Sequence, residues 1–310
     1  MNVYVVIGLA VGITVIIFVI VYGNKKNKVH EDSITSIVNR IKPYQPKFLP
    51  EHLKTEVRTA ADGIVNPKTA DDYFLKGYVA SMDKNYENAL KFYQKTIQLN
   101  AKYVEAYHEM GIAYENKRKY DEEIQYYQKA IDLYPDDALA YNNMGIAYQN
   151  IGKYDEAFQS FQKAIEVSPD DVVAYNNIGV AYQNKGKYDE AIQSYQKVIR
   201  LKPDYVKVYN NMGLAYANTG NFNEAIHAYQ KAIQFKPDYA EAYQNMGNAY
   251  FQAGRNLQAI QTFQKTIELN PDLAGAYHNM GIAYQILGNQ YEADECFQKR
   301  NEIEKNNECI

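Results

Sequence analysis

The side chains that most often perform catalysis or bind metals are sparse in this sequence. The five histidines, at positions 30, 52, 108, 227 and 278, show none of the spacings that zinc ligands require. The segment from Gly145 to Gly152 and Lys153 differs from a phosphate-binding loop, because six residues separate the glycines instead of four and no Ser or Thr follows the lysine. We therefore predict no catalytic residue, no metal site and no cofactor, and we expect that the protein is not an enzyme.

Amide side chains are the polar groups that recur at a regular spacing. One row, 34 residues from member to member, comprises Asn143, Asn177, Asn211, Asn245 and Asn279. A second row comprises Asn150, Asn184 and Asn218, and an apolar row between them comprises Ile146, Val180 and Leu214. An asparagine side chain both donates and accepts hydrogen bonds, so such rows can pair with the backbone of an extended peptide regardless of its sequence. These residues form our candidate binding site.

The same asparagines have a second interpretation that involves no ligand. Asn is a mediocre helix former, and Asn142, Asn143, Asn150 and their equivalents in the next two repeats would together cost about 5 kcal/mol relative to Ala. A long array with ample packing tolerates such a cost, and a generally Asn-rich background would produce the same rows. Both interpretations are open at this point.

A 34-residue unit positions these amides. Residues 138–171 read ALAYNNMGIAYQNIGKYDEAFQSFQKAIEVSPDD, and the next 34 residues repeat the pattern. Tyr141 and Tyr148 belong to one run with helical spacing, Gly152 then suits a helix end, and a second run around Phe161 ends at Pro169. A fixed period of this length predicts stacked helix-turn-helix units.

Eight positions of the unit carry a family resemblance. Positions 4, 7, 8, 11, 20, 24, 27 and 32 of residues 138–171 hold Tyr141, Met144, Gly145, Tyr148, Ala157, Phe161, Ala164 and Pro169. This pattern is similar to that of the tetratricopeptide repeat (TPR) family, and it covers roughly residues 70–307. The resemblance implies an all-α, right-handed solenoid of about seven repeats: 70–103, 104–137, 138–171, 172–205, 206–239, 240–273 and 274–307. It also implies that the first helices line a concave groove at positions 2, 6, 9 and 13.

Two details qualify the resemblance. The row at position 6 resembles the asparagine ladder in the TPR arm of O-GlcNAc transferase, whereas the residues at position 5 do not fit the carboxylate clamp of chaperone-binding TPR proteins. Glu123 stands where the family has Ala, so we expect either looser packing there or a carboxylate that reaches solvent.

The first 69 residues differ from the repeats. Residues 3–22 carry no charge and would span about 30 Å as a helix, the thickness of a bilayer core. Lys25, Lys26 and Lys28 follow, so the positive-inside rule predicts a single-pass membrane protein with its N-terminus outside and its TPR domain cytoplasmic. The expected order is a transmembrane anchor over 1–23, a basic Pro-containing linker over 24–50, a capping helix over 51–69 and a TPR solenoid over 70–310. Gly8 and Gly12 have the spacing of a helix-pairing motif, which makes self-association possible.

The predicted function follows from the surface that stacking leaves open. The net charge of −4 offers no case for nucleic acid. We predict a membrane-tethered adaptor whose Asn-lined groove binds an extended segment of a partner protein. The alternatives are a self-assembling scaffold, or the regulatory arm of a membrane-associated enzyme complex that resembles the O-GlcNAc transferase arm without a catalytic domain.

Overall fold

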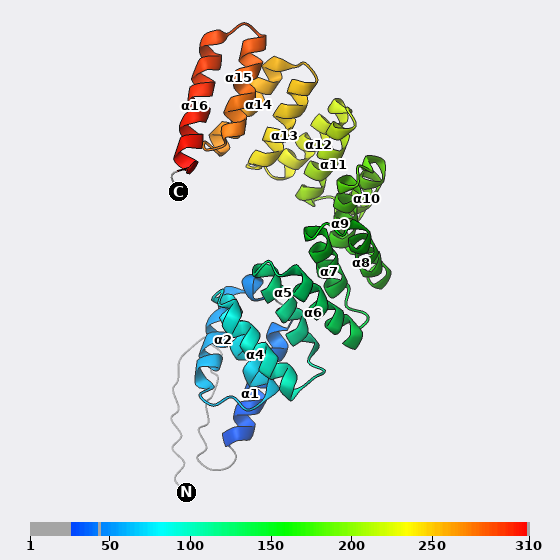
Figure 1. Ribbon diagram of the computed structural model, residues 1–310, viewed down its shortest axis with the longest axis vertical. Helices are drawn as coiled ribbons and strands as arrows, with labels where there is room; N and C mark the ends of the chain where they lie inside the picture. Colours follow the sequence, from blue (N-terminus) through cyan, green and yellow to red (C-terminus); the bar gives the residue numbers. More distant parts are fainter. Residues whose placement is uncertain (1–25, 43–44, 309–310) are drawn as a thin grey trace, which may run out of the picture. The chain divides into compact units, whose positions relative to one another are not determined.

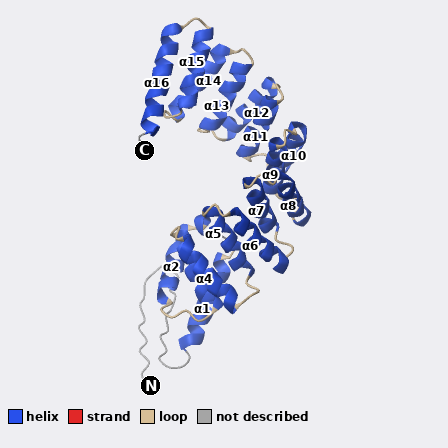
Figure 2. Cartoon of the chain, viewed as in Figure 1, coloured by secondary structure: helices blue, strands red, loops and turns tan. Residues whose placement is uncertain are grey.

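The protein is represented by a computed structural model, which describes residues 26–42 and 45–308. Every regular element in these residues is helical (Figures 1 and 2). Three elements precede the repeats: α1 (Lys26–Ile41), the 3-10 helix η1 (Pro46–Phe48) and α2 (Glu51–Gly63). The predicted all-helical repeat array is confirmed.

Each repeat contains a first and a second helix. The first helices are α3 (Ala70–Met82), α5 (Val104–Asn116), α7 (Ala138–Asn150), α9 (Val172–Asn184), α11 (Val206–Asn218), α13 (Ala240–Gln252) and α15 (Ala274–Ile286). The second helices are α4 (Tyr86–Leu99), α6 (Tyr120–Leu133), α8 (Tyr154–Val167), α10 (Tyr188–Leu201), α12 (Phe222–Phe235), α14 (Asn256–Leu269) and α16 (Gln290–Glu308).

The predicted membrane localisation is contradicted. Among residues 26–42 and 45–308, no helix is long and apolar enough to cross a bilayer. A span needs about 20 apolar residues, whereas α7 has 13 residues, α8 has 14 and the 19-residue α16 is rich in charges. The predicted transmembrane helix over 3–22 lies outside the described residues. A single-pass protein with cytoplasmic repeats is therefore not retained.

The turn inside each repeat depends on one left-handed residue. In repeat three that residue is Gly152, with φ of 76°, and the amide of Lys153 donates to the carbonyl of Tyr148 to close the end of α7. Lys84 and Arg118 occupy the same position in the first two repeats at φ of 58° and 55°. A side chain with a Cβ is strained in this region, so the first two turns are less relaxed than the later ones.

The two helices of a repeat approach closely because position 8 is glycine. A Cβ added at Gly111 would lie 2.6 Å from Cε1 of Tyr127, and one added at Gly145 would lie 2.5 Å from Cε1 of Phe161. The aromatic ring at position 24 therefore occupies the space that a side chain at position 8 would need. This contact recurs along the array and explains the pairing of Gly with Tyr or Phe in each unit.

The helices divide into two compact units, and the boundary in the sequence lies between Pro135 and Asp136. In the first unit, α1, η1 and α2 pack against α3. The apolar face of α1, comprising Ile34, Ile37, Val38 and Ile41, is buried in the same core as Leu53 and Val57 of α2. Residues 24–50, which the sequence predicts to be a linker, thus contain a helix that contributes to the core.

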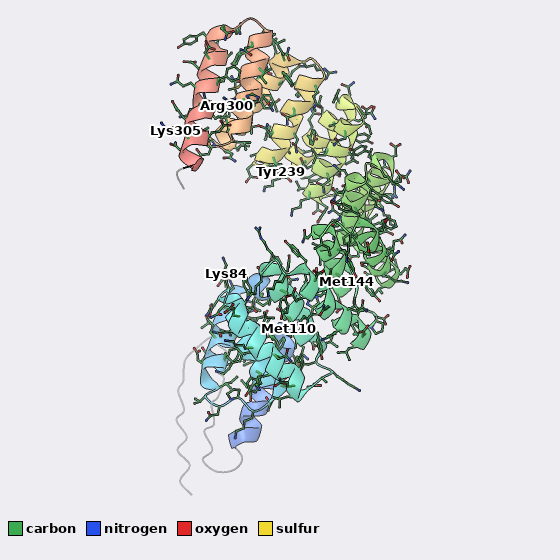
Figure 3. All side chains as sticks on the ribbon, viewed as in Figure 1. Lys84, Met110, Met144, Tyr239, Arg300 and Lys305 are labelled. Atoms are coloured by element: carbon green, nitrogen blue, oxygen red, sulfur yellow. The ribbon has the colours of Figure 1, made fainter. Side chains whose placement is uncertain are left out.

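The second unit contains α7 to α16. Each first helix in it contacts the next first helix, while no second helix makes comparable contact with the next second helix among the described residues. The first helices therefore line the inner side of this unit. In its last repeat, position 27 is Arg300 instead of Ala, and this residue lies on α16 (Figure 3). Nη1 of Arg300 lies 3.2 Å from Nδ1 of His278, and its guanidinium carbon lies 5.9 Å from the centroid of the Phe297 ring.

Candidate peptide-binding groove

The predicted rows lie on the inner side of the second unit. We use "inner stripe" for positions 2, 6, 9 and 13 of α7, α9, α11, α13 and α15. The asparagines at position 6 and the apolar residues Ile146, Val180 and Leu214 are partly buried, whereas Asn150, Asn184 and Asn218 are exposed. At position 2, Leu139 and Val173 are 50% and 43% exposed. Because neighbouring first helices are in contact, the structure brings these rows together on one surface.

The amides at position 6 are also engaged between repeats. Nδ2 of Asn177 lies 3.3 Å from Oδ1 of Asn142 in the preceding repeat. Nδ2 of Asn211 donates to Oδ1 of Asn176 at 3.1 Å, and Nδ2 of Asn245 donates to Oδ1 of Asn210 at 3.0 Å. We call this series of bonds the amide ladder; it joins four consecutive repeats, from the third to the sixth.

The acceptors of the amide ladder are the residues that the sequence analysis did not include in the site. Asn142, Asn176 and Asn210, at position 5, are only 2%, 9% and 1% exposed. A buried amide without partners is strongly destabilising, so each must be paired. The available signal was the Asn-Asn doublet that recurs at positions 5 and 6 of three successive repeats.

The buried amides have further partners that complete the network. Nδ2 of Asn142 donates to Oδ2 of Asp171 at 2.8 Å, and the other carboxylate oxygen of Asp171 caps α9 by accepting from the amide of Val173. Nδ2 of Asn210 donates to Oε1 of Glu241 at 3.0 Å. Each such bond contributes about 1 kcal/mol net, which offsets the poor helix propensity of Asn.

The amide ladder changes after the sixth repeat. Position 5 of the sixth repeat is Gln244 instead of Asn, and its Nε2 lies 3.5 Å from Oδ1 of Asn248. Asn279 consequently donates to Oδ1 of Asn248 at 2.8 Å instead of to a residue at position 5. The regular part of the groove therefore runs from α7 to α13.

Part of the hydrogen-bonding capacity of the groove is left over. Each Nδ2 carries two hydrogens, and among the described residues the Oδ1 atoms of Asn211 and Asn245 accept no hydrogen bond. Asn218 at position 13 donates to the carbonyl of Leu214 in its own helix, which leaves its Oδ1 available. The groove can thus both donate to and accept from a polypeptide backbone.

Charge is nearly absent from the inner stripe, where Lys207 and Glu241 are the only charged residues. Glu241 accepts from Asn210 and lies 3.4 Å from the hydroxyl of Tyr239. Lys207 is exposed and forms no ion pair within the described part of the chain. A ligand that fills the groove therefore meets two charges, the carboxylate of Glu241, which accepts hydrogen bonds from neutral groups, and the ammonium of Lys207, which has no ion-pair partner among the described residues.

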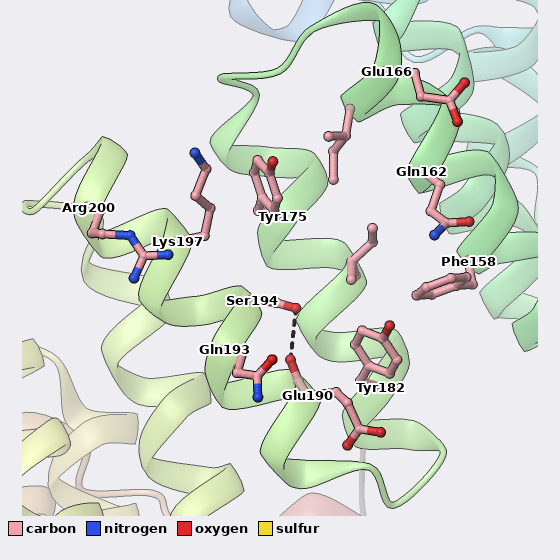
Figure 4. A pocket seen from close by; sticks show the side chains of 12 residues that line it. Phe158, Gln162, Glu166, Tyr175, Tyr182, Glu190, Gln193, Ser194, Lys197 and Arg200 are labelled. Carbon is pink, nitrogen blue, oxygen red and sulfur yellow. Dashed lines mark hydrogen bonds between the residues drawn. The ribbon is translucent and has the colours of Figure 1, made fainter.

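A separate crevice lies away from the inner stripe and is lined by side chains of α8, α9 and α10 (Figure 4). It has a volume of about 540 Å³. Its apolar part contains Phe158, whose ring packs edge-on against that of Tyr182 with 5.0 Å between the ring centroids. Hollows at the same repeat positions occur beside Met110 and Tyr114 and beside Met212 and Tyr216. This recurrence identifies the crevice as a consequence of stacking, and nothing around it distinguishes one occupant.

Among the described residues of the first unit, three carboxyl groups are buried, those of Asp72, Glu109 and Glu123. Glu123 is 1% exposed, its Oε2 has no hydrogen-bond partner, and burial raises its pKa to about 8, with a smaller contribution from Glu115. The expectation that this carboxylate reaches solvent is wrong. Within the described residues, no cluster of His, Cys, Asp and Glu has an arrangement suited to a metal ion.

The fold and the groove define a class of protein, the helical repeat solenoids that present an extended inner surface to a ligand. Family models described as tetratricopeptide repeat match residues 104–137, 138–171, 160–193 and 274–307, and one described as TPR repeat matches 184–220, 216–254 and 247–288. These matches run without interruption over more than half of the sequence. The chain belongs to the tetratricopeptide repeat family, whose arrays mediate protein–protein interaction.

Solved structures agree with this assignment. The crystal structure of MamA is 29% identical over 54% of this chain and 98% of its own, with a TM-score of 0.51. The C-terminal part of a TPR repeat-containing protein from Cytophaga hutchinsonii is 20% identical over 74% of this chain and 95% of its own, with a TM-score of 0.60. The APC/C hetero-tetramer Cut9–Hcn1 is 18% identical over 82% of this chain and 52% of the matched chain, with a TM-score of 0.61. The last two show the fold alone. No curated protein matches the chain.

Proposed function

We propose that the groove of the second unit binds an extended, largely uncharged segment of a partner protein. The observation that carries this proposal is the combination of exposed aliphatic side chains with a row of amides that retain hydrogen-bonding capacity. Leu139 and Val173 are about half exposed, and the Oδ1 atoms of Asn211 and Asn245 have no acceptor role within the described chain. The asparagine at position 6 recurs along four consecutive first helices, α7, α9, α11 and α13, and such a row suits a linear ligand better than a compact one.

The chemistry of the groove favours recognition of a backbone. A peptide N–H would donate to an Oδ1 of the ladder, and a peptide carbonyl would accept the second hydrogen of an Nδ2. The apolar row would bury aliphatic side chains of the segment, each worth about 1.5–3 kcal/mol when fully buried. Specificity for particular side chains would then come from the apolar row, and part of the affinity from the amides.

The test uses substitutions that do not disturb the stacking. Asn→Ala changes at position 6 are unsuitable, because those amides also link the repeats. Leu139→Glu combined with Val173→Glu places charge in the groove at side chains that are already about half exposed. Leu257→Glu on α14, a second helix, is the matched control, since Leu257 is 66% exposed. Partners of the full chain would be captured by crosslinking and identified by mass spectrometry.

We expect the double groove variant to lose at least one partner that the wild-type chain and Leu257→Glu both retain. Circular dichroism would verify that all three proteins have the same helical content. If the groove variant and the control retained the same partners in the same amounts, the proposed function would be refuted.

A further inference from the structure

The amide ladder repeats with a constant register. In three successive junctions, Nδ2 at position 6 meets Oδ1 at position 5 of the preceding repeat at 3.3, 3.1 and 3.0 Å. Each junction joins residues that are 35 positions apart. The side-chain rows of the groove therefore advance by one equal step from α7 to α9, from α9 to α11 and from α11 to α13.

The length of that step follows from helix packing. Neighbouring first helices are in direct contact, and packed helices lie about 8–10 Å apart. An extended polypeptide advances about 3.3 Å per residue, so about three residues pass each repeat. A ligand that makes the same contact in every repeat must then present the same side at every third residue.

Backbone conformations differ in whether they meet this requirement. A polyproline II segment has three residues per turn and a rise of about 3.1 Å, so the same side returns every ~9.3 Å, close to the step of the groove. A β-strand returns the same side every ~6.7 Å, and its side chains would lose register within two repeats. An α-helix turns every ~5.4 Å and has the same difficulty.

Lys207 adds a charge requirement to the spacing. It is the unpaired positive charge of the inner stripe, whereas the other charged residue, Glu241, is held by Asn210. Covering Lys207 with an apolar side chain would remove a cation from water without compensation. A carboxylate of the ligand placed next to Lys207 avoids this loss and fixes the register of the segment along the groove.

We infer that the groove selects a segment in the polyproline II conformation with an uncharged, apolar residue at every third position and one acidic residue that pairs with Lys207. This inference rests on the proposed function and specifies the chemistry of the ligand for the same groove. The amide row spans four repeats, or three steps of about 9 Å, which corresponds to about ten residues of such a segment, and the apolar row of Ile146, Val180 and Leu214 spans three of these repeats.

The probes are three fluorescein-labelled 15-residue peptides of identical composition, containing leucine, proline, serine and one central glutamate. In the first, leucine recurs every third residue; in the second, every second residue; in the third, at helical spacing. Fluorescence anisotropy with the full chain measures Kd. We expect the period-three peptide to bind at least tenfold more tightly than either rearranged peptide, and we expect Leu139→Glu combined with Val173→Glu to abolish that binding.

The charge requirement is tested with a charge exchange. Lys207→Glu should weaken binding of the period-three peptide about tenfold, and replacing the central glutamate of the peptide by lysine should restore affinity for that variant. Lys231→Glu on α12, a second helix, is the matched control and should leave Kd unchanged. Equal weakening by Lys207→Glu and Lys231→Glu would overturn the pairing.

The outcomes separate the inference from the proposed function. If the three peptides bound equally and the groove variant abolished all binding, the inference would be wrong while the proposed function stood. If no peptide bound, the inference would be overturned, and the crosslinking experiment would decide the proposed function on its own.

Discussion

The first repeat and the later repeats use the same helix positions in opposite ways. At positions 6 and 9, α3 carries Leu75 and Tyr78, which are 0% and 1% exposed in the core shared with α1 and α2. The corresponding positions of α7, α9 and α11 carry asparagines and aliphatic residues that are partly exposed. The comparison shows that this face becomes part of a core where the chain supplies its own cover, and stays partly exposed where it does not.

Polar contacts indicate how the cover is attached. Oγ1 of Thr35 on α1 donates to Oδ2 of Asp71 at 2.6 Å, and Nζ of Lys42, directly after α1, lies 3.0 Å from Oε1 of Glu105. Asp71 and Glu105 both occupy position 2, the position that Leu139 and Val173 hold in the later repeats. The N-terminal segment thus reaches the inner positions of two successive first helices in the first unit.

The largest effect should come from placing a charge under this cover. Ile41 is 0% exposed, so Ile41→Glu should destabilise the first unit by about 4–5 kcal/mol and release α1 from α3. Leu139→Glu, at a side chain 50% exposed, should change the stability of the second unit by less than about 1 kcal/mol. Hydrogen exchange of peptides from α3 and α7 measures the change in stability of the first and of the second unit. Equal loss of protection in the two units would mean that the first repeat is not a covered core.

Glu123 should make the stability of the first unit depend on pH. Its pKa is raised from an ordinary value of 4.5 to about 8 in the folded chain, so the unfolded chain loses its proton first as pH rises. Stability should therefore fall between about pH 4.5 and pH 8, by at most about 1.4 kcal/mol per pH unit. The later repeats have Ala at this position and should lack this dependence.

Hydrogen exchange of α6 and α12 peptides, corrected for the intrinsic effect of pH on exchange, would measure the difference. Glu123→Gln is the control and should flatten the profile of α6. A profile of α6 that was flat in the wild-type chain would contradict the burial of an uncharged carboxyl group at this position.

Glycine substitutions should affect both units equally. Gly111→Ala and Gly145→Ala each force a Cβ against the aromatic ring of position 24, at Tyr127 and Phe161, and should destabilise their repeats by about 1–3 kcal/mol. Local protection by hydrogen exchange would report each effect. A cost confined to one unit would show that the contact between paired helices, as well as the inner face, differs between the units.

The smallest effect should come from the ion pair that links the cover to the second repeat. Lys42 and Glu105 are both partly exposed, so Lys42→Ala should reduce the protection of α1 by less than about 1 kcal/mol. The difference from the wild-type chain should shrink in 1 M salt, where charges are screened. A larger effect that salt did not alter would point to packing of the Lys42 stem on the ring of Tyr103, which lies 5.1 Å from Nζ.

The sequence predicts the parts of the fold that depend on local pattern. Helical spacing, the turn glycines and the pairing of Gly145 with Phe161 are all encoded within one 34-residue unit, so they are recoverable without coordinates. The helical spacing of Ile34, Val38 and Ile41 is also present in the sequence, but their packing partner is not evident from it, because that partner lies in a repeat that begins some 30 residues later.

The candidate site was predictable only in outline. The rows of Asn143, Ile146 and their equivalents follow from the period, whereas the amide ladder depends on contacts between residues 35 positions apart in neighbouring repeats. Asn142 and Asn143 are adjacent and chemically identical, yet one is buried and the other partly exposed. A single sequence does not reveal which member of such a doublet holds the stack together.

The amide ladder has a consequence for how tightly the groove can hold a ligand. Asn177, Asn211 and Asn245 are each oriented by a hydrogen bond to the neighbouring repeat before any partner arrives. Immobilising a free side chain on association costs about 0.5–1.5 kcal/mol, and a side chain that is already fixed avoids most of this loss. The hydrogen bonds that join the repeats therefore hold these side chains in place in advance, which lowers the entropic cost of binding the proposed ligand.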